Sequence, residues 1–428
     1  MREVVIVDGL RTPYIKAGTL FKDITAQELG RTVVAELVVR SGIDPELIDE
    51  VVIGNIAQPA EAANIARVIA LMAGLPRKIP AFTVGRNCAS GMESIANAFL
   101  KIRAGEAEVM LVGGVESMSN IPLLYPKDFA EVMAEAARAK TAAQRMAAFA
   151  KIRPKHLKPI IGLQVGLTDP ICDLNMGETA EVLAKEFLIS REEQDKFALM
   201  SHERATQATD LGKLKEEIVP VFPPPKRAMP VDEDNGIRKN QSMEALQKLR
   251  PAFDRNYGTV TAGNSSQITD GAAAMLVMSA EKAKELGYEP LGTIRSYAFA
   301  GLDPARMGLG PAYSTPIALK KAGVAFKDIK LIEINEAFAA QVIANEQVFR
   351  DRKLAQDRLG LDDAIGEIDR EILNVNGGAI ALGHPVGSSG TRIVLTLLKE
   401  MQRRSLDLGL ATLCVGGGQG GAMIVERT

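Results

Sequence analysis

The stretch NCASGMESIANAFLKIRAG, from Asn87 to Gly105, is followed at once by the apolar run EVMLVGG. A stretch of the same order returns near the end of the chain, where NGGAIALGHPVGSSGTRIVLTLLKEM, from Asn376 to Met401, precedes LATLCVGGG. In each copy a Gly-rich turn opens a segment of helical period, and a short apolar run that ends in glycines follows. The two stretches therefore indicate a repeated unit of turn, helix and buried strand.

A second pair of segments precedes these stretches in the same order. Residues 26–41 form an amphipathic pattern that leads to DEVVIGN, which ends at Asn55, and residues 314–323 lead to DIKLIEIN, which ends at Asn335. Val/Ile runs alternate with longer helical segments, which is typical of an α/β fold with buried, largely parallel strands. Any two α/β halves look somewhat alike, but the matched order and matched glycines favour duplication. We predict the α/β class with two duplicated halves.

The region between the halves has a different composition. From Ala136 to Thr168 there are seven Lys or Arg residues and no acidic residue, and such a run attracts anions. The second half also carries a charged segment at 350–370, which we expect to form a surface helix. The predicted organisation is a first half at 1–117 and 251–288, an inserted loop lobe at 118–250, and a second half at 289–428.

Composition excludes several classes of protein. The 428 residues carry a net charge of only −2, with 4% aromatic residues and no Trp, which argues against a dedicated nucleic-acid binder. Three cysteines cannot build a disulfide framework, so a reducing compartment is expected. Residues 1–13 lack the pattern of a signal peptide, and no apolar run is long enough to span a membrane. We expect a soluble, cytoplasmic protein.

Three chemically competent side chains fall in Gly-rich turns: Cys88, His384 and Cys414. Cys88 opens a helix, where the partial positive charge of the helix N-terminus favours the thiolate and hence a nucleophile. A buried structural cysteine is the alternative interpretation. The other candidate groups, Cys172, His156 and His202, lie in the inserted lobe.

His384 occupies the corresponding turn of the second copy, so a pseudo-two-fold axis would bring it to Cys88, although a packing histidine is the alternative. Cys414 ends a strand beside glycines whose N–H groups can bind an anion. Two thiols and one imidazole make a poor zinc site, and acyl transfer fits them better. Asn335 ends a strand where its amide could polarise a carbonyl, but Asn is also common there and at helix N-caps.

Five motifs in this order resemble the thiolase family of coenzyme A-dependent acyltransferases: NCASGMESI, GGVESMS, NEAFAAQ, NGGAIALGHPVGSSGTR and CVGGGQGGAM. The resemblance implies the thiolase fold, with two α/β halves in layered αβαβα packing and an inserted loop lobe. DNGIRKNQSMEALQKLRPAF and TVTAGNSSQITDGAAA look most like the thiolase subunits of the bacterial β-oxidation complex and of the trifunctional protein. Those subunits usually have His where this chain has Asn335.

By resemblance, Cys88 is the acyl-accepting nucleophile, His384 is its base, and Cys414 exchanges a proton at the α-carbon of the acetyl unit. Asn335, through a water, and His384 would stabilise the enolate oxygen. The backbone N–H groups of Cys88 and Gly416 would form a second oxyanion hole. The implied reaction is thiolytic cleavage of 3-ketoacyl-CoA through a thioester, with CoA as a substrate and no cofactor or metal.

By family position, Ser266 and Met176 should line the pantetheine tunnel, and Asn175 and Phe338 should also contact the substrate. Short-chain biosynthetic thiolases usually have His at the position of Asn175, so a preference for acetoacetyl-CoA is less expected. The basic run at 136–168 matches the phosphates of CoA. Expected partners are acyl-CoA and CoA, a second copy in a homodimer or homotetramer, and either a β-oxidation hydratase/dehydrogenase or a weak membrane-surface contact.

Three other functions remain open from the sequence. The first is a short-chain acetyl-CoA C-acetyltransferase that forms or cleaves acetoacetyl-CoA. The second is a ketoacyl synthase on the same fold, which would pair its cysteine with two His, or with His and Asn, and against which Cys414 argues. The third is a non-catalytic acyl-CoA or lipid carrier, against which the intact Cys88, His384 and Cys414 argue.

Overall fold

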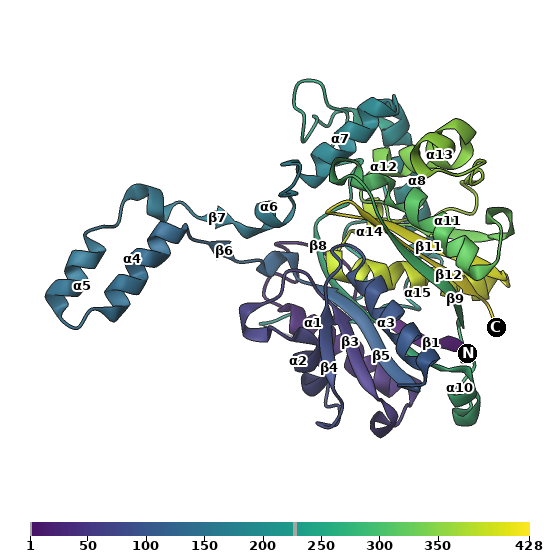
Figure 1. Cartoon of the computed structure of the whole chain (residues 1–428), viewed down its shortest axis with the longest axis horizontal. Helices are drawn as coiled ribbons and strands as arrows, with labels where there is room; N and C mark the ends of the chain where they lie inside the picture. The colour runs from purple at the N-terminus through teal and green to yellow at the C-terminus, as the bar shows by residue number, and fades with distance from the viewer. Residues whose placement is uncertain (1, 226–228) are drawn as a thin grey trace.

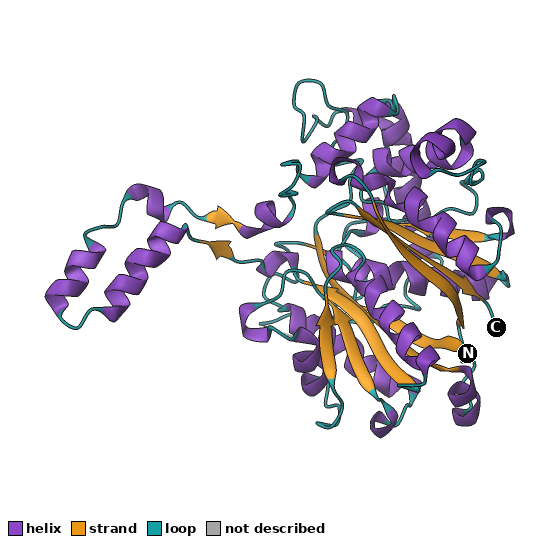
Figure 2. Cartoon of the chain, in the orientation of Figure 1, coloured by secondary structure: helices purple, strands orange, loops and turns teal. Residues whose placement is uncertain are grey.

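The computed structural model describes residues 2–225 and 229–428. Its main sheet has two halves, visible as two groups of strands in Figure 2. The halves are joined by a short antiparallel contact in which Val5 faces Thr293 and Ile6 faces Gly292. In spatial order the first half contains β4 (Ala81–Val84), β3 (Glu50–Gly54), β5 (Val109–Glu116), β8 (Thr269–Ser279) and β1 (Val4–Arg11), and the second contains β9 (Gly292–Gly301), β12 (Gln419–Glu426), β11 (Leu408–Val415) and β10 (Leu331–Ile334).

The two halves repeat the same strand directions. β3 runs parallel to β5 and β5 antiparallel to β8, just as β10 runs parallel to β11 and β11 antiparallel to β12. The expectation of largely parallel strands is wrong, because β8, β12 and their neighbours pair antiparallel. All residues of β8 are buried, so this strand lacks the alternation that normally marks an antiparallel strand.

Helices fill three layers around the sheet halves. α3 (Ser90–Ala104) and α15 (Val386–Arg404) pack against each other between the halves, and their apolar residues form a shared core with the inner faces of both. α1 (Ala26–Ser41) and α2 (Ile65–Met72) cover the outer face of the first half. α11 (Gly310–Ala322) and α12 (Ala339–Arg350) cover that of the second. The αβαβα layering and the duplication are confirmed.

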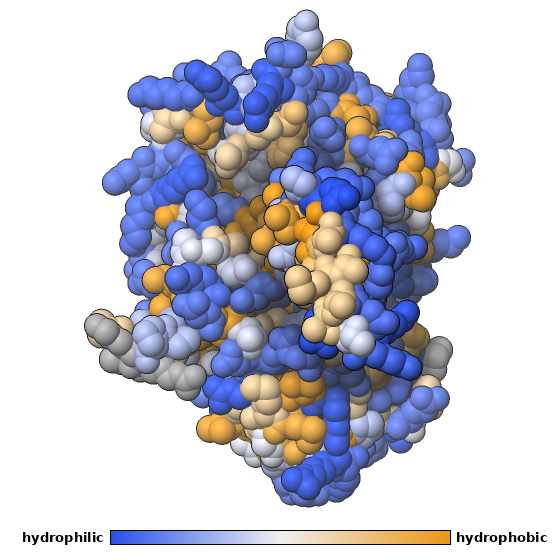
Figure 3. Space-filling view, turned by 90° about the vertical axis from the view of Figure 1, so that its left-hand side faces the viewer, coloured by the Kyte–Doolittle hydropathy of each residue, from blue (hydrophilic) through white to orange (hydrophobic). Residues whose placement is uncertain are grey.

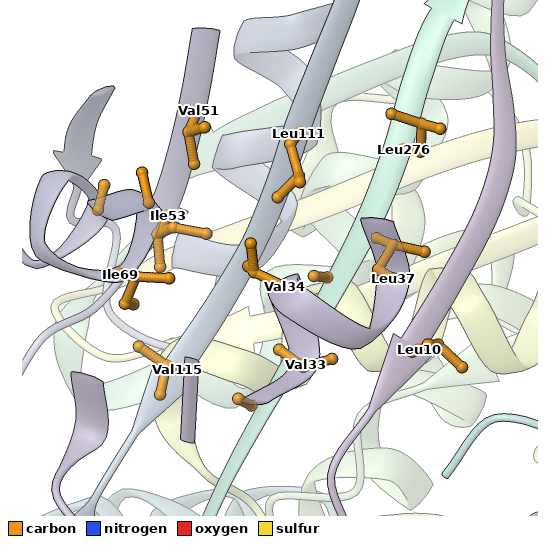
Figure 4. Packing of buried hydrophobic residues seen from close by; sticks show 14 of the residues in the cluster. Leu10, Val33, Val34, Leu37, Val51, Ile53, Ile69, Leu111, Val115 and Leu276 are labelled. Carbon is orange, nitrogen blue, oxygen red and sulfur yellow. The ribbon is translucent and has the colours of Figure 1, made fainter. Parts of the chain in front are cut away.

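The first outer layer shows how the sequence specifies a helix. Thr25 caps α1 in a reciprocal capping box with Glu28, and Gly42 ends it with a φ of 69°. The helix thus has the bounds predicted from its periodicity. Figure 4 shows its apolar side chains above those of the strands: Val33, Val34 and Leu37 lie over Val51, Ile53, Leu111 and Leu276.

The inserted region begins with a projecting arm (Figure 1). Its helices α4 (Lys127–Arg138) and α5 (Ala142–Phe149) form a hairpin, and a two-stranded ribbon of β6 (Leu123–Leu124) and β7 (Ile160–Ile161) joins the hairpin to the body. α7 (Met176–Glu186) and α8 (Arg191–Asp210) then pack against α12. The remaining elements are β2 (Ile15–Lys16), α6 (Gly162–Gly166), α9 (Met243–Gln247), α10 (Ala280–Leu286), α13 (Arg352–Leu359) and α14 (Ala379–Leu382).

The surface helix expected at 350–370 is shorter than predicted. α13 is mostly exposed but ends where Gly360 adopts a φ of 66°. The chain that follows is irregular up to α14. Within the described part of the chain, no helix has both the length and the apolarity that crossing a bilayer requires.

Gly420 provides a test of the close packing of α11 on β12. A Cβ atom at this position would collide with the carbonyl oxygen of Gly310 at the start of α11. We expect Gly420→Ala to lower the free energy of unfolding by about 2 kcal/mol through overpacking. Gly301→Ala, on the adjacent β9, is the control, because its Cβ would meet nothing within 4 Å. Urea denaturation measures the free energy of unfolding of the two variants. Equal values for Gly420→Ala and Gly301→Ala would contradict this packing.

Candidate active site

The N-terminal ends of α3 and α15 bring two turns together. Cys88 lies two residues before α3 begins, and His384 lies two residues before α15 begins. The helices approach closely, because a Cβ atom at Gly91 would lie 2.5 Å from Thr391 Oγ1 and 2.9 Å from the carbonyl oxygen of Gly387. Glycine at this contact therefore allows the two turns to share one cavity.

That cavity has a volume of about 570 Å³ and holds most of the predicted site residues. Its lining includes Cys88, His384, Cys414, Ser266, Met176, Asn175 and Phe338. A second cavity, of about 960 Å³, adjoins it at Cys88 and Met176 and is also lined by Gly416. Asn335 lines neither cavity. It is fully buried, and its two amide atoms have no hydrogen-bond partner among the described residues.

Burial dominates the ionisation of Cys88. It raises the pKa of the thiol, while the backbone N–H groups of Gly416 and of Cys88 itself, which point at the sulfur, act in the opposite direction. The buried carboxyl of Glu116 raises this pKa further. The sequence predicted a pKa lowered by the helix start, but the net shift is upward, because loss of water outweighs the N–H groups of Gly416 and Cys88.

His384 is held as a neutral base. Burial, together with the positive charge of Arg392, lowers the pKa of the imidazole to about 4. Ser389 Oγ lies 2.6 Å from His384 Nδ1 and donates its own hydrogen to the carbonyl oxygen of Pro385 at 3.1 Å. With the Ser389 hydrogen directed at Pro385, the tautomer that completes this set of hydrogen bonds carries its proton on Nδ1 and donates it to Ser389. The other nitrogen, Nε2, keeps a free lone pair and has no partner among the described residues.

Cys414 is buried as a neutral thiol. Burial, and then the nearby Cys88, raise its pKa well above the usual range for cysteine. It packs with Met307, Ala337 and Phe338, all of which line the smaller cavity. A thiol in these surroundings keeps its proton at neutral pH and is suited to give it to a carbanion that forms beside it.

The loop at 263–267 joins the parts of the site. The N–H of Ser266 donates to the carbonyl of Ala337 at 2.9 Å, and the N–H of His384 donates to the carbonyl of Gln267 at 3.0 Å. Phe338 is the N-cap residue that precedes α12, and its ring contacts Phe253 edge to face. The site therefore rests on backbone hydrogen bonds between segments far apart in the sequence.

Two further predicted residues have structural contacts as well as positions in the cavity lining. Asn175 caps α7 by accepting hydrogen bonds from the N–H groups of Gly177 and Glu178. Met176 lies beside Gly416, whose carbonyl oxygen accepts a 2.7 Å hydrogen bond from Asn87 Nδ2. These contacts place the Gly416 turn over Cys88.

Sequence reasoning missed two polar residues of the site. Ser389 sets the orientation of His384, and Glu116 is buried where the larger cavity meets Cys88. Glu116 stood in the quoted motif GGVESMS, and its signal was a single acidic residue after an otherwise apolar strand. Among the described residues, no group of three or more His, Cys, Asp or Glu side chains is placed to hold a metal ion.

The charged residues at the cavity also differ from the expectation. The basic residues of 136–168 line neither cavity, since they lie in the arm, where Lys151 pairs with Glu135 and Lys155 with Asp128. The cationic residues in the lining of the smaller cavity are instead Lys16 and Arg238. In the sequence the basic run at 136–168 contains no acidic residue, because the acids that pair with it, Glu135 and Asp128, come before it in α4.

One cavity is lined by a cysteine, a neutral imidazole and a second thiol, and two N–H groups point at the sulfur of that cysteine. This arrangement is suited to acyl transfer through a cysteine thioester. The family model of the thiolase N-terminal domain matches residues 4–281, and that of the C-terminal domain matches residues 288–427. The chain therefore belongs to the thiolase family.

Its relatives align over nearly the whole chain. It is 45% identical to the 3-ketoacyl-CoA thiolase of Yersinia enterocolitica and 44% identical to that of Serratia proteamaculans, in both cases over 99% of this chain and 96% of the relative. Among solved structures, Bacillus anthracis acetyl-CoA acetyltransferase is similar with a TM-score of 0.87, 38% identity and coverage of 100% and 99% of the two chains. Human mitochondrial 3-ketoacyl-CoA thiolase in complex with CoA is similar with a TM-score of 0.85 and 37% identity, over 100% of this chain and 98% of that chain.

The contact between Ser389 and His384 predicts a specific effect on catalysis. Ser389→Ala removes the acceptor for Nδ1–H, so we expect kcat to fall about 100-fold while the fold is retained. Ser388→Ala is the matched control, because the Ser388 hydroxyl lies 2.7 Å from the Tyr14 hydroxyl, whereas the hydroxyl at His384 Nδ1 is that of Ser389. Steady-state kinetics measure kcat of the two variants, and circular dichroism checks that each one is folded. Equal losses of kcat in both variants would contradict the role of Ser389.

Proposed function

We propose that this chain cleaves 3-ketoacyl-CoA with CoA to give acetyl-CoA and a shortened acyl-CoA, as in fatty-acid β-oxidation, and catalyses the reverse Claisen condensation. The convergence of Cys88, His384 and Cys414 on one cavity is the observation that carries this proposal. The names of the relatives support it. A non-catalytic carrier would have no need for a base and a second thiol beside the first.

The first half-reaction begins at Cys88. Its sulfur attacks the 3-keto carbon while His384 Nε2 takes the thiol proton. The bond between C2 and C3 then breaks, and its electron pair forms the enolate of acetyl-CoA. The Cys414 thiol gives its proton to C2, and acetyl-CoA leaves a thioester on Cys88. Incoming CoA gives its thiol proton to the Cys414 thiolate and attacks that thioester. The bond from the carbonyl carbon to the Cys88 sulfur then breaks, the sulfur takes back its proton from His384, and the shortened acyl-CoA is released.

Two groups of donors would stabilise the charge that develops on oxygen. The N–H groups of Cys88 and Gly416 point at the region of the Cys88 sulfur, which supports their role as an oxyanion hole for the tetrahedral species. His384 and Asn335, the latter through a water, would stabilise the enolate oxygen. The buried Asn335 amide supports this assignment, because it has no partner within 2–225 and 229–428 and buried polar groups are normally hydrogen-bonded.

CoA would occupy the smaller cavity as a substrate, with no cofactor required. Ser266, Met176 and Phe338 would contact the pantetheine arm, for which this apolar lining with a few polar groups is suitable. Lys16 and Arg238 in the same lining supply positive charge for the phosphates. They replace the arm residues as candidates for this contact.

The larger cavity favours a long acyl chain over the short-chain alternative. Its walls carry the apolar side chains of Met118, Ile121, Leu124, Leu163 and Val165, and it begins at Cys88. Beyond its 3-keto carbon, acetoacetyl-CoA would place only a methyl group there, which fills little of about 960 Å³. We propose substrates with a medium or long acyl chain, whose burial would contribute about 0.8 kcal/mol per methylene.

We also propose a homodimer or homotetramer. β4 lies at the end of the sheet, with its outer edge unpaired by any described strand. Exposed apolar side chains lie on the helices that flank it, Met72 on α2 and Leu100 on α3. An unpaired strand edge beside exposed apolar side chains is suited to contact with a second copy.

The arm supports a further contact in the cytoplasm, with a β-oxidation partner enzyme or, weakly, with a membrane surface. Its ribbon and hairpin expose apolar residues, and Figure 3 shows orange and blue residues side by side on the face from which the arm projects. Leu123, Leu124, Ile161, Met146 and Phe149 are exposed here. Ion pairs with acids of α4 reduce the positive charge available for anionic lipid.

Separating the roles of the two thiols tests the proposed reaction. Cys88→Ser should form no acyl-enzyme, because a hydroxyl has a far higher pKa than a thiol. Cys414→Ala should still accept an acyl group on Cys88 but should not exchange the α-protons of acetyl-CoA with deuterium from the solvent. Intact-protein mass spectrometry and NMR measure these steps. Acylation of the Ser variant elsewhere, or normal exchange in the Ala variant, would refute the assignment.

A substitution in the larger cavity tests the chain-length proposal. Ile121→Trp narrows this cavity, so we expect kcat/KM for a long-chain 3-ketoacyl-CoA to fall about tenfold or more, with little change for acetoacetyl-CoA. Val39→Trp, at an exposed position on α1, controls for the added indole. The measurement is kcat/KM of the wild type and of the two variants for a series of 3-ketoacyl-CoA substrates of increasing chain length. A wild-type enzyme most active on acetoacetyl-CoA would reject the proposal.

A further inference from the structure

The duplication gives the site residues at the strand ends of the second half counterparts in the first half. In the first half Gly54 of β3 faces Gly114 of β5, and in the second Ile334 of β10 faces Thr412 of β11. One residue further along β3 and β10 stand Asn55 and Asn335. Two residues further along β5 and β11 stand Glu116, which faces Gly271, and Cys414, which faces Gly420. Asn55 is therefore the counterpart of Asn335, and Glu116 is the counterpart of Cys414.

The two pairs have different surroundings. The amide of Asn335 has no hydrogen-bond partner among the residues that the structure describes, whereas Asn55 Nδ2 donates to the carbonyl of Val115 at 2.9 Å and to Glu116 Oε1 at 2.8 Å. The Glu116 carboxylate also accepts the N–H groups of Ile56 at 3.2 Å and Ala57 at 3.0 Å. The first-half pair is thus fixed by hydrogen bonds within the protein.

A further hydrogen bond reaches the other half of the molecule. Gly387 N–H, in the first turn of α15, donates to Glu116 Oε2 at 3.0 Å. Gly387 follows His384 by three residues, and a Cβ there would lie 2.6 Å from the Val115 carbonyl and 2.9 Å from Glu116 Oε2. A carboxylate at a helix N-terminus is also favoured by the helix dipole. One buried side chain therefore connects the His384 turn to the strand ends beside Cys88.

We propose that Glu116, oriented by Asn55, is a positioning residue that fixes the His384 turn relative to Cys88. It acts through Gly387 N–H and, through Ile56 and Ala57, also holds one wall of the larger cavity. Burial raises the pKa of its carboxyl to about 7, and the N–H groups and the Asn55 amide around it favour the charged form. This inference rests on the proposed pairing of Cys88 with His384.

Glu116→Gln tests the proposal, because it keeps the side-chain shape but puts an amino group where N–H donors converge. We expect kcat to fall about 100-fold, the KM for CoA to stay within about threefold, and alkylation of Cys88 by iodoacetamide to slow in parallel with kcat. Asn55→Ala should lower kcat about tenfold, with the same unchanged KM for CoA and the same slower alkylation of Cys88. This variant tests the proposal if Glu116→Gln does not fold. His384→Ala gives the reference for a lost base.

Glu400→Gln is the matched control for loss of a buried carboxylate. Glu400 lies near the other end of α15 and accepts hydrogen bonds from Asn376, Arg403, Arg404 and Lys213. It should lose stability but keep kcat and the alkylation rate of Cys88. A folded Glu116→Gln enzyme with kcat within threefold of wild type, or with no more loss than the control, would overturn the proposal. Wild-type protein that forms no acyl-enzyme would instead count against the proposed function.

Discussion

The packing of α3 against α15 is the contact on which the site depends. The two helices lie between the sheet halves and cross where only glycine fits: Gly91 meets Thr391 and Gly387, and a Cβ atom at Gly390 would collide with the backbone nitrogen of Met92. Because the helices meet at their N-terminal ends, the turns before them share one cavity. The duplication of the fold thus places a thiol and an imidazole opposite each other without any sequence proximity.

Enclosure between the sheet halves sets the charges of that pair. Loss of water raises the pKa of Cys88 and lowers that of His384, so both shifts favour the uncharged forms. Arg392, fully buried on α15 and paired with Glu333 at 3.0 Å, adds to the shift of His384. These two shifts predict a resting enzyme with a neutral thiol and a neutral imidazole, in which the proton moves only as sulfur attacks the substrate.

The sequence predicted what local patterns determine. The capping residues and period of α1 specified its bounds, and β10 was found at Leu331–Ile334 from its apolar run. Strand direction was not predictable, since a strand such as β8, buried on both faces, looks the same in sequence whether it runs parallel or antiparallel. Glu116 was missed for a related reason: its partners Asn55, Ala57 and Gly387 come from distant segments. The pairing of arm cations with the acids of α4 also required the hairpin to be seen.

The ionisation of Cys88 in the resting enzyme shows whether the thiol and the imidazole are both neutral before substrate binds. The ultraviolet absorbance of the thiolate, taken as the difference between wild type and Cys88→Ser, can be followed across a pH titration. Our account predicts no thiolate at neutral pH and its appearance only above the ordinary thiol range of about 8.5. A thiolate already present near neutral pH, which disappears in His384→Ala, would show a preformed ion pair and contradict the account.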